Sequence, residues 1–322
     1  MYEKNNKVNK NFYQSGRYAL YYGLSKVLKH KVKLKKILLP NFICKEVIQP
    51  LQRLDLNIDF YHVNRDLNIN IEEIVNKNIK DSTIFFVVNY FGFPADWSSI
   101  NSLKKDLNLF VVEDNAHSAF TKYKNKRLGD QGDLSFNSLR KFLPILGGSE
   151  LMTDYSNETI YQKQVSRMPS LEELKYSLRH LKPSILKNKK NNGVADDSFN
   201  LKLSSIDWIS NILLNKNSFD ENKIAESRIN NYKFWEKYLH DWDVKFFDHL
   251  KINNDICPYA FPCITKNNDQ TKKIIEWGNK KNINIIKWPK FPHHERFIYP
   301  ENDLQNVILF PVNHQYDLNK IL

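Results

Sequence analysis

The chain contains the stretch Leu109-Phe110-Val111-Val112-Glu113-Asp114-Asn115-Ala116-His117, which is followed by Ser135-Phe136-Asn137-Ser138-Leu139-Arg140-Lys141. The apolar run at the start of the first stretch is typical of a buried strand, and Asp114 closes it. In open α/β folds, ligands bind at the carboxyl ends of the sheet strands. The two stretches therefore predict an α/β sheet with a ligand site at its edge, close to an acid and a lysine.

The pattern around these stretches alternates short apolar runs with amphipathic segments. We predict strands over 37–40, 58–63, 83–89, 109–114 and 150–153, and helices over 16–30, 44–54 and 98–106. Such alternation is typical of βαβ units and a mostly parallel sheet. Further helices are predicted over 206–214, 220–238 and 272–281, within a stretch that favours a smaller α+β domain. The sequence thus predicts a large domain over 1–205 and a small C-terminal domain over 206–322.

Composition narrows the class of protein. The 322 residues are 41% hydrophobic and 26% charged, as in an ordinary globular protein. No apolar run reaches the roughly 18 residues of a membrane span, and the polar start lacks the apolar region of a signal peptide. The three cysteines, Cys44, Cys257 and Cys263, show no metal-ligand spacing, which favours reduced thiols and a cytoplasmic protein. We predict no metal site.

The net charge of +12 raises the alternative of nucleic-acid binding. Lysine and asparagine are both abundant and no long basic block occurs, so a biased composition explains the charge better. The excess is also compatible with an anionic, nucleotide-linked substrate.

An acid and a lysine at a sheet edge are the two groups that pyridoxal 5'-phosphate (PLP) requires. The acid pairs with the pyridinium nitrogen and the lysine forms the Schiff base. Around these residues the chain resembles the DegT/DnrJ/EryC1/StrS family of PLP-dependent nucleotide-sugar aminotransferases, from about Ser15 to Gln315. The resemblance implies the PLP-dependent transferase fold type I, and a homodimer with shared active sites.

The family motif Glu-Asp-x-Ala-(Gln/His) reads Glu113-Asp114-Asn115-Ala116-His117 here. By resemblance, Asp114 keeps the ring nitrogen protonated, and His117 lies against the ring or orients the carboxylate. An isolated aspartate after a strand is often only a helix cap or turn residue. The apolar strand before Asp114 and the histidine after it favour the site.

The position of the reactive lysine is open. The family reads Ser-Phe-x-x-x-Lys, and counting from Ser135 without a gap reaches Arg140. Arginine cannot serve, because its guanidinium stays protonated. The adjacent Lys141 takes the role if the loop holds one extra residue, and a subset of the family reads Ser-Leu-Arg-Lys-Phe-Leu-Pro here. The alternatives are Lys141 as the catalytic lysine, or a site that is altered or inactive.

The resemblance also implies contacts to the PLP phosphate. Ser135 is one predicted ligand. The family's Ser-Gly-Thr-x-Ala-Leu reads Ser15-Gly16-Arg17-Tyr18-Ala19-Leu20, at the start of a predicted helix whose N-terminus can bind an anion. We expect Gly16 and Arg17 to bind the phosphate, with Arg17 as an ordinary surface residue as the alternative.

Two further segments match cofactor contacts of the family. In Pro40-Asn41-Phe42-Ile43-Cys44, either Phe42 or Cys44 is expected to cover the PLP ring, with a buried Cys44 that has no role as the alternative. Asn200, in Phe199-Asn200-Leu201-Lys202, is expected to reach the phosphate in the neighbouring subunit, with a helix cap as its alternative.

The function implied by the resemblance is transfer of an amino group, with glutamate as the expected donor, to a nucleotide-linked keto-sugar in surface polysaccharide or aminosugar biosynthesis. Two rivals stay open: a sugar dehydratase, in which histidine replaces the lysine, and a non-catalytic relative. No histidine occurs between residues 135 and 148, which disfavours the dehydratase. The family's stretch before its Ser-Gly-Thr motif is missing, so the substrate specificity is expected to differ.

Overall fold

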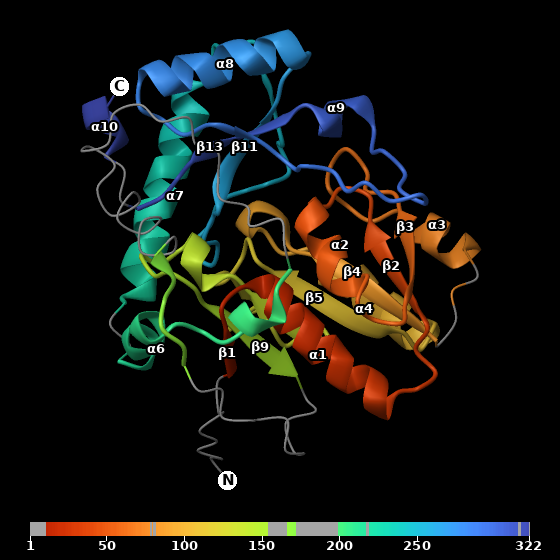
Figure 1. The fold of residues 1–322 in the computed structure, drawn as a ribbon. Helices are drawn as coiled ribbons and strands as arrows, with labels where there is room; N and C mark the ends of the chain where they lie inside the picture. Colours follow the sequence, from red (N-terminus) through yellow and green to blue (C-terminus); the bar gives the residue numbers. More distant parts are fainter. Residues whose placement is uncertain are drawn as a thin grey trace.

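The computed structural model describes residues 11–77, 79, 82–153, 166–171, 199–216, 219–314 and 317–321. Its centre is a seven-stranded sheet in the order β1-β9-β8-β5-β4-β2-β3 (Figure 1). The strands are β1 (Asn11–Tyr13), β2 (Lys36–Pro40), β3 (Asn57–Tyr61), β4 (Thr83–Val88), β5 (Phe110–Asn115), β8 (Leu134–Asn137) and β9 (Ser149–Thr153). Neighbouring strands pair in parallel along β3, β2, β4, β5 and β8. Strands β9 and β1 complete one edge of the sheet in antiparallel pairing.

The two central strands are apolar because both faces of the sheet are covered. Every residue of β4 and of β5 is buried, including the polar end of β5. The helices of this region are α1 (Gly16–His30), α2 (Ile48–Leu51), α3 (Ile71–Asn76) and α4 (Trp97–Asp106). Its 3-10 turns are η1 (Lys45–Val47), η2 (Tyr90–Gly92) and η3 (Leu139–Lys141), and β6 (Lys122–Tyr123) and β7 (Lys126–Arg127) form a small hairpin.

A second sheet is antiparallel and belongs to the C-terminal part, in the order β10-β11-β13-β12. Its strands are β10 (Lys245–Phe246), β11 (Ala260–Ile264), β12 (Ile286–Lys287) and β13 (Val307–Pro311). The long helix α7 (Glu221–Tyr238) runs along β11 (Figure 1). The remaining elements are η5 (Leu201–Leu203), α6 (Trp208–Asn215), α8 (Asn268–Lys280), α9 (Asn302–Gln305) and α10 (Leu318–Ile321).

The predicted fold class, a mostly parallel sheet followed by a smaller α+β unit, is confirmed. The boundary at residue 205 stays a prediction. Helix α6, which follows it, bonds to the first unit, since the backbone N–H groups of Leu146 and Gly147 donate to the Ser210 hydroxyl at 3.0 and 3.2 Å.

Some element limits differ from the predicted ones. The helix predicted over 44–54 is two short turns that end at Leu51, and the strand predicted over 58–63 ends at Tyr61. Strand β8 was not predicted, because its four residues are too short and too mixed to show a period. It is buried by its neighbours β5 and β9. The predicted loop around 189–193 lies outside the described residues, as does Gln315.

Among the described residues, no helix has the length and apolar character needed to cross a membrane.

Candidate active site

Asp114 lies at the carboxyl end of β5, beside β8. In the β5–β8 register it pairs with Phe136, while Glu113 pairs with Ser135. Paired residues share a face and neighbours along a strand alternate, so Asp114 and Phe136 lie on one face and Ser135 on the other. The strand carries the acid to the edge that the sequence predicted.

The Asp114 side chain is only 6% exposed. One carboxylate oxygen accepts a hydrogen bond from the Ala116 backbone N–H at 2.8 Å. Burial raises the pKa of Asp114 to about 6, and the Ala116 N–H and the charge of Lys141 oppose that rise. The carboxyl is therefore mostly ionised at pH 7, and its pKa is close enough to 7 that it can also be protonated.

Lys141 and its neighbour Arg140 lie on the same 3-10 turn, η3, but differ in surroundings. Arg140 is exposed, whereas Lys141 is partly buried. The Lys141 Nζ lies 5.1 Å from the ring centre of Tyr259. Burial lowers the pKa of the Lys141 amine, and the nearby groups Cys44 and Asp114 raise it in part. Lys141, with its amine at the inner end of the turn, is thus the better placed of the two candidates.

His117 is 4% exposed and lies in an aromatic stack. Its ring is 4.3 Å from that of Tyr259 at an angle of 10°, and 5.8 Å from that of Phe91 at 16°. Burial, and then the charge of Lys141, hold the pKa of His117 well below its usual value. The imidazole is therefore neutral at pH 7, and its buried Nδ1 finds no hydrogen-bond partner among the residues that the structure describes.

Of the two residues expected to cover the PLP ring, Cys44 is the one near the acid and the lysine. It is a partly buried free thiol, whose pKa burial raises to about 12, with Glu46 next in effect and Lys141 and Asp114 also acting on it. Phe42 is fully buried behind it. The Phe42 ring packs at 4.9 Å against Trp288, so it supports the wall of the site from the core.

The N-terminus of α1 begins against the end of β8. A Cβ on Gly16 would lie 3.2 Å from the Phe136 ring and 3.6 Å from the Asn137 carbonyl oxygen, so only glycine fits without displacement. The Ser15 hydroxyl is buried there, and no described residue forms a hydrogen bond with it. Arg17 donates from Nη1 to the Gln49 Oε1 at 2.6 Å. The helix start is therefore on the face of the sheet that carries Asp114.

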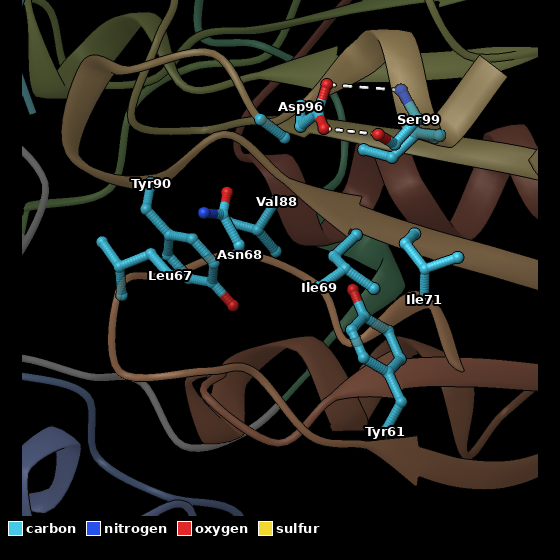
Figure 2. A pocket seen from close by; sticks show the side chains of 11 residues that line it. Tyr61, Leu67, Asn68, Ile69, Ile71, Val88, Tyr90, Asp96 and Ser99 are labelled. Atoms are coloured by element: carbon cyan, nitrogen blue, oxygen red, sulfur yellow. Dashed lines mark hydrogen bonds between the residues drawn. The ribbon is translucent and has the colours of Figure 1, made fainter. Parts of the chain in front are cut away.

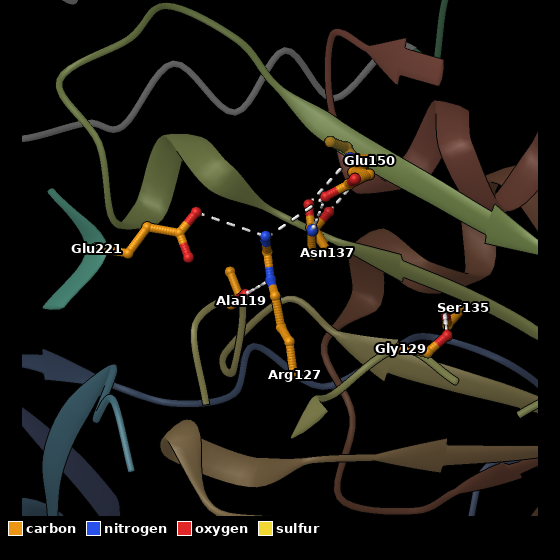
Figure 3. Close-up of polar contacts among 8 residues, drawn as sticks. Ala119, Arg127, Gly129, Ser135, Asn137, Glu150 and Glu221 are labelled. Carbon is orange, nitrogen blue, oxygen red and sulfur yellow. Dashed lines mark hydrogen bonds and ion pairs between the residues drawn. The ribbon is translucent and has the colours of Figure 1, made fainter. Parts of the chain in front are cut away.

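Ser135, the predicted phosphate ligand, lies on the face of β8 away from Asp114, as the β5–β8 register requires. Its hydroxyl donates to the Gly129 carbonyl at 2.5 Å (Figure 3). This facing follows from the strand alternation, which the motif does not reveal. The phosphate contact by Ser135 stays a prediction, and the Ser15 hydroxyl, which has no partner among the described residues, is a second candidate donor.

Asn200 caps the turn η5. Its side-chain oxygen accepts from the Lys202 backbone N–H at 3.1 Å, and its carbonyl accepts from the Tyr18 hydroxyl at 2.8 Å. The side chain is thus the helix cap of the alternative reading. It is exposed near α1, and its contact with a neighbouring subunit stays a prediction.

The C-terminal part contributes a wall that the sequence did not reveal. The Tyr259 N–H donates to the Phe91 carbonyl at 2.8 Å. Gly92 has a φ of +105°, and a Cβ on it would lie 2.5 Å from the Cys257 carbonyl oxygen. This close approach seats Tyr259 between His117 and Lys141. Only the long-range contact identifies it, because Tyr259 belongs to no motif of the chain.

A polar network supports the loop after His117 (Figure 3). Arg127 donates from Nε to the Ala119 carbonyl at 2.6 Å, and its Nη atoms lie 3.5 Å from Glu150 and 3.6 Å from Glu221. Asn137 donates to the same Glu150 at 3.2 Å. The end of β8, strand β9 and helix α7 are thereby tied together around the site.

A cavity adjoins the site at the carboxyl ends of β3 and β4 (Figure 2). Tyr90 stands between the two, since it lines the cavity and interacts electrostatically with Asp114 and Cys44. Its hydroxyl donates to the Phe42 carbonyl at 2.7 Å, and that of Tyr61 to the Phe86 carbonyl at 2.9 Å. Both hydroxyls are thus committed to the backbone, and the rest of the lining is mostly aliphatic.

The residues present fit PLP. The buried Asp114 carboxyl suits a protonated ring nitrogen, and the Lys141 amine interacts with it electrostatically. Ser15 Oγ and His117 Nδ1 are buried polar atoms with no hydrogen-bond partner in the described part of the chain, which is costly unless a ligand satisfies them. A helix N-terminus next to Ser15 suits a phosphate.

Comparison with known proteins shows the family of the chain. The sequence model of the DegT/DnrJ/EryC1/StrS aminotransferase family matches residues 14–303. An uncharacterized protein of Methanocaldococcus jannaschii is 34% identical over 96 residues, which is 30% of this chain and 25% of that protein. The GDP-perosamine synthase of Escherichia coli O157:H7 is 31% identical over 100 residues, 31% of this chain and 28% of the enzyme. The matched segments thus span about a quarter of these relatives.

Solved structures share the fold over 97% of this chain. An aminotransferase of the same family from Brucella abortus has a TM-score of 0.64 at 18% identity, with 83% of its chain covered. Helicobacter pylori PseC, an aminotransferase of pseudoaminic acid biosynthesis, has 0.65 at 16%, with 83% covered. The E. coli GDP-4-keto-6-deoxy-D-mannose-3-dehydratase with bound hydrated PLP has 0.65 at 18%, with 85% covered.

The predicted fold type I is confirmed by these structures, and the predicted resemblance by the family match. With a match over residues 14–303, the chain belongs to the DegT/DnrJ/EryC1/StrS aminotransferase family.

Proposed function

We propose that the chain is a PLP-dependent aminotransferase that acts on a nucleotide-linked keto-sugar, with glutamate as the amino donor. The observation that carries the proposal is the electrostatic interaction between the Lys141 amine and the Asp114 carboxyl, on segments at the carboxyl ends of the parallel strands β8 and β5. Membership of the family supports it, as do relatives named as nucleotide-sugar enzymes, such as the GDP-perosamine synthase. The product would enter surface polysaccharide or aminosugar biosynthesis in the cytoplasm.

PLP, when bound, supplies an electron sink next to the carbon whose proton is moved. Asp114 would hold a proton on the ring nitrogen, because a carboxylate beside a cation favours the charged form of both. Lys141 is the general base and acid. Burial lowers its pKa, which enlarges the neutral fraction that can accept a proton at Nζ. The neutral His117 orients the ring or the carboxylate without adding a competing charge.

At the phosphate end, we propose that Ser15, Gly16 and Arg17 bind the anion through the hydroxyl and the first backbone N–H groups of α1. Arg17 already engages Gln49, so its guanidinium would reach the phosphate only by sharing its donors. In a homodimer with shared sites, Asn200 would approach the partner's phosphate from the exposed turn η5.

The test is borohydride reduction of the purified protein with PLP, followed by peptide mapping. Reduction fixes PLP on the lysine that holds it. We expect the label on Lys141 in the natural protein and in the matched control Arg140→Gln, and its loss in Lys141→Ala. Label on another lysine, or none, would refute the assignment.

The rival is a PLP-dependent sugar dehydratase, the activity named for the E. coli structure. The same experiment separates the two, because that chemistry is expected where histidine stands in place of the lysine. PLP bound without a labelled lysine would favour the dehydratase. A chain that binds no PLP would favour a non-catalytic relative.

A further inference from the structure

Arg228, on α7, is a buried arginine whose charge has no carboxylate partner in the described part of the chain. It is 1% exposed, and its guanidinium lies 4.5 Å from the Phe142 ring centre. A buried cation without a counter-ion is costly, and an aliphatic side chain would fill the same volume more favourably. The contacts that the guanidinium makes are therefore the place to seek its role.

Among the described residues, the hydrogen bonds of the guanidinium all go to backbone carbonyls of the candidate site. Arg228 Nη2 donates to the Lys141 carbonyl at 2.9 Å, and Nη1 donates to the Pro258 carbonyl at 3.1 Å and to the Tyr259 carbonyl at 3.4 Å. Because the guanidinium is planar and rigid, the two nitrogens fix the distance between the segments that they bind. One of these segments carries Lys141, and the other carries Tyr259.

The two side chains held in this way face each other. The Lys141 Nζ lies 5.1 Å from the Tyr259 ring centre, and the same ring stacks on His117 at 4.3 Å. We propose that Arg228 is a positioning residue, whose fork between the Lys141 and Pro258–Tyr259 carbonyls holds the Lys141 amine over Tyr259 and toward Asp114. The proposal rests on the function proposed for Lys141, and adds a residue of the C-terminal part that controls it.

The readout is the reactivity of Lys141 in the protein without PLP. Acylation is followed by mass spectrometry across pH, because only the neutral amine reacts. The groups that act on this amine come from four segments of the chain: Cys44, Glu46, Asp114, His117, Arg140 and Tyr259. Arg228→Gln leaves all of them in place. If the fork is lost, η3 loosens, the amine gains water, and the midpoint of acylation rises toward the value of about 10.4 for a free lysine.

The matched control is Trp235→Phe on the same helix. Trp235 is fully buried and donates from Nε1 to the Pro311 carbonyl at 2.8 Å, so the control also removes one buried bond from α7 to the backbone. It touches neither Lys141 nor Tyr259 and is expected to keep the natural midpoint. Arg228→Lys keeps the positive charge but lacks the forked guanidinium. It is the test variant if Arg228→Gln does not fold.

A raised midpoint in either Arg228 variant would support the proposal. A natural midpoint in the folded variant, or an equal shift in Trp235→Phe, would overturn it. Since acylation needs no PLP, the result is separate from the borohydride test. Failure to label Lys141 with PLP would remove the proposed function and leave the role of Arg228 in placing the lysine intact.

Discussion

Asp114→Asn is expected to make the protein without PLP more stable at neutral pH, while weakening PLP binding. The pKa of Asp114 rises from 3.8 to about 6 because the carboxyl is buried at the sheet edge. At 1.36 kcal/mol per pH unit, this corresponds to about 3 kcal/mol lost from the free energy of unfolding when the group is ionised. Asparagine has the same shape and stays neutral, so it avoids that loss.

The sign follows from linkage. A carboxyl whose pKa is raised on folding contributes stability that is fully present below the unfolded value of 3.8 and is lost as pH rises through about 6. The advantage of Asp114→Asn should therefore be near zero below pH 3.8, reach about half of its full size at pH 5, and level off at about 3 kcal/mol above pH 7.

The assay is urea unfolding of the PLP-free protein at several pH values, followed by tryptophan fluorescence. Asp96→Asn is the control, since the pKa of that exposed helix cap is lowered by the Ser98 and Ser99 hydroxyls. It should show a small effect of the opposite sign. An Asp114→Asn variant that is less stable than the natural protein at pH 8, or whose advantage does not change with pH, would refute the reasoning.

Two further predictions concern the phosphate end and the wall of the site. Ser15→Ala should weaken PLP binding by about tenfold, which is the effect of losing one hydrogen bond to a charged group, and should leave the melting temperature unchanged. Titration of PLP absorbance measures the affinity, and an unchanged affinity would remove Ser15 from the site. Gly92→Ala should destabilise the protein by about 2 kcal/mol or more, because φ is +105° and the new Cβ would meet the Cys257 carbonyl and Pro258. A melting temperature equal to that of the natural protein would contradict the close approach.

The sheet and its acid were predictable because their signals are local. A continuous apolar run such as the one before Asp114 is compatible only with burial on both faces, and it sets the strand direction that brings the acid to the carboxyl edge. The same strand end predicts the position of His117, three residues after Asp114. No long-range information is needed for either.

The lysine and the serine of the second motif were not settled by spacing. Arg140 and Lys141 are adjacent, so the geometry of turn η3 decides which of them points inward. Ser135 matches the motif and yet faces Gly129, because the strand alternation turns it away from Asp114. Such facing depends on where β8 begins and on the neighbours that pair with it.

By itself, the sequence determined the α/β class, the family, and the acid at the sheet edge, since these depend on residues close together in the chain. Only the tertiary structure brings Lys141 and Cys44 into electrostatic interaction with Asp114, sets Tyr259 against Lys141, and joins Arg228 to the Lys141 carbonyl. The physical reason is that these contacts join separate segments of the chain, as the Arg228–Lys141 hydrogen bond does across 87 positions, and such a contact leaves no periodic signal in the sequence.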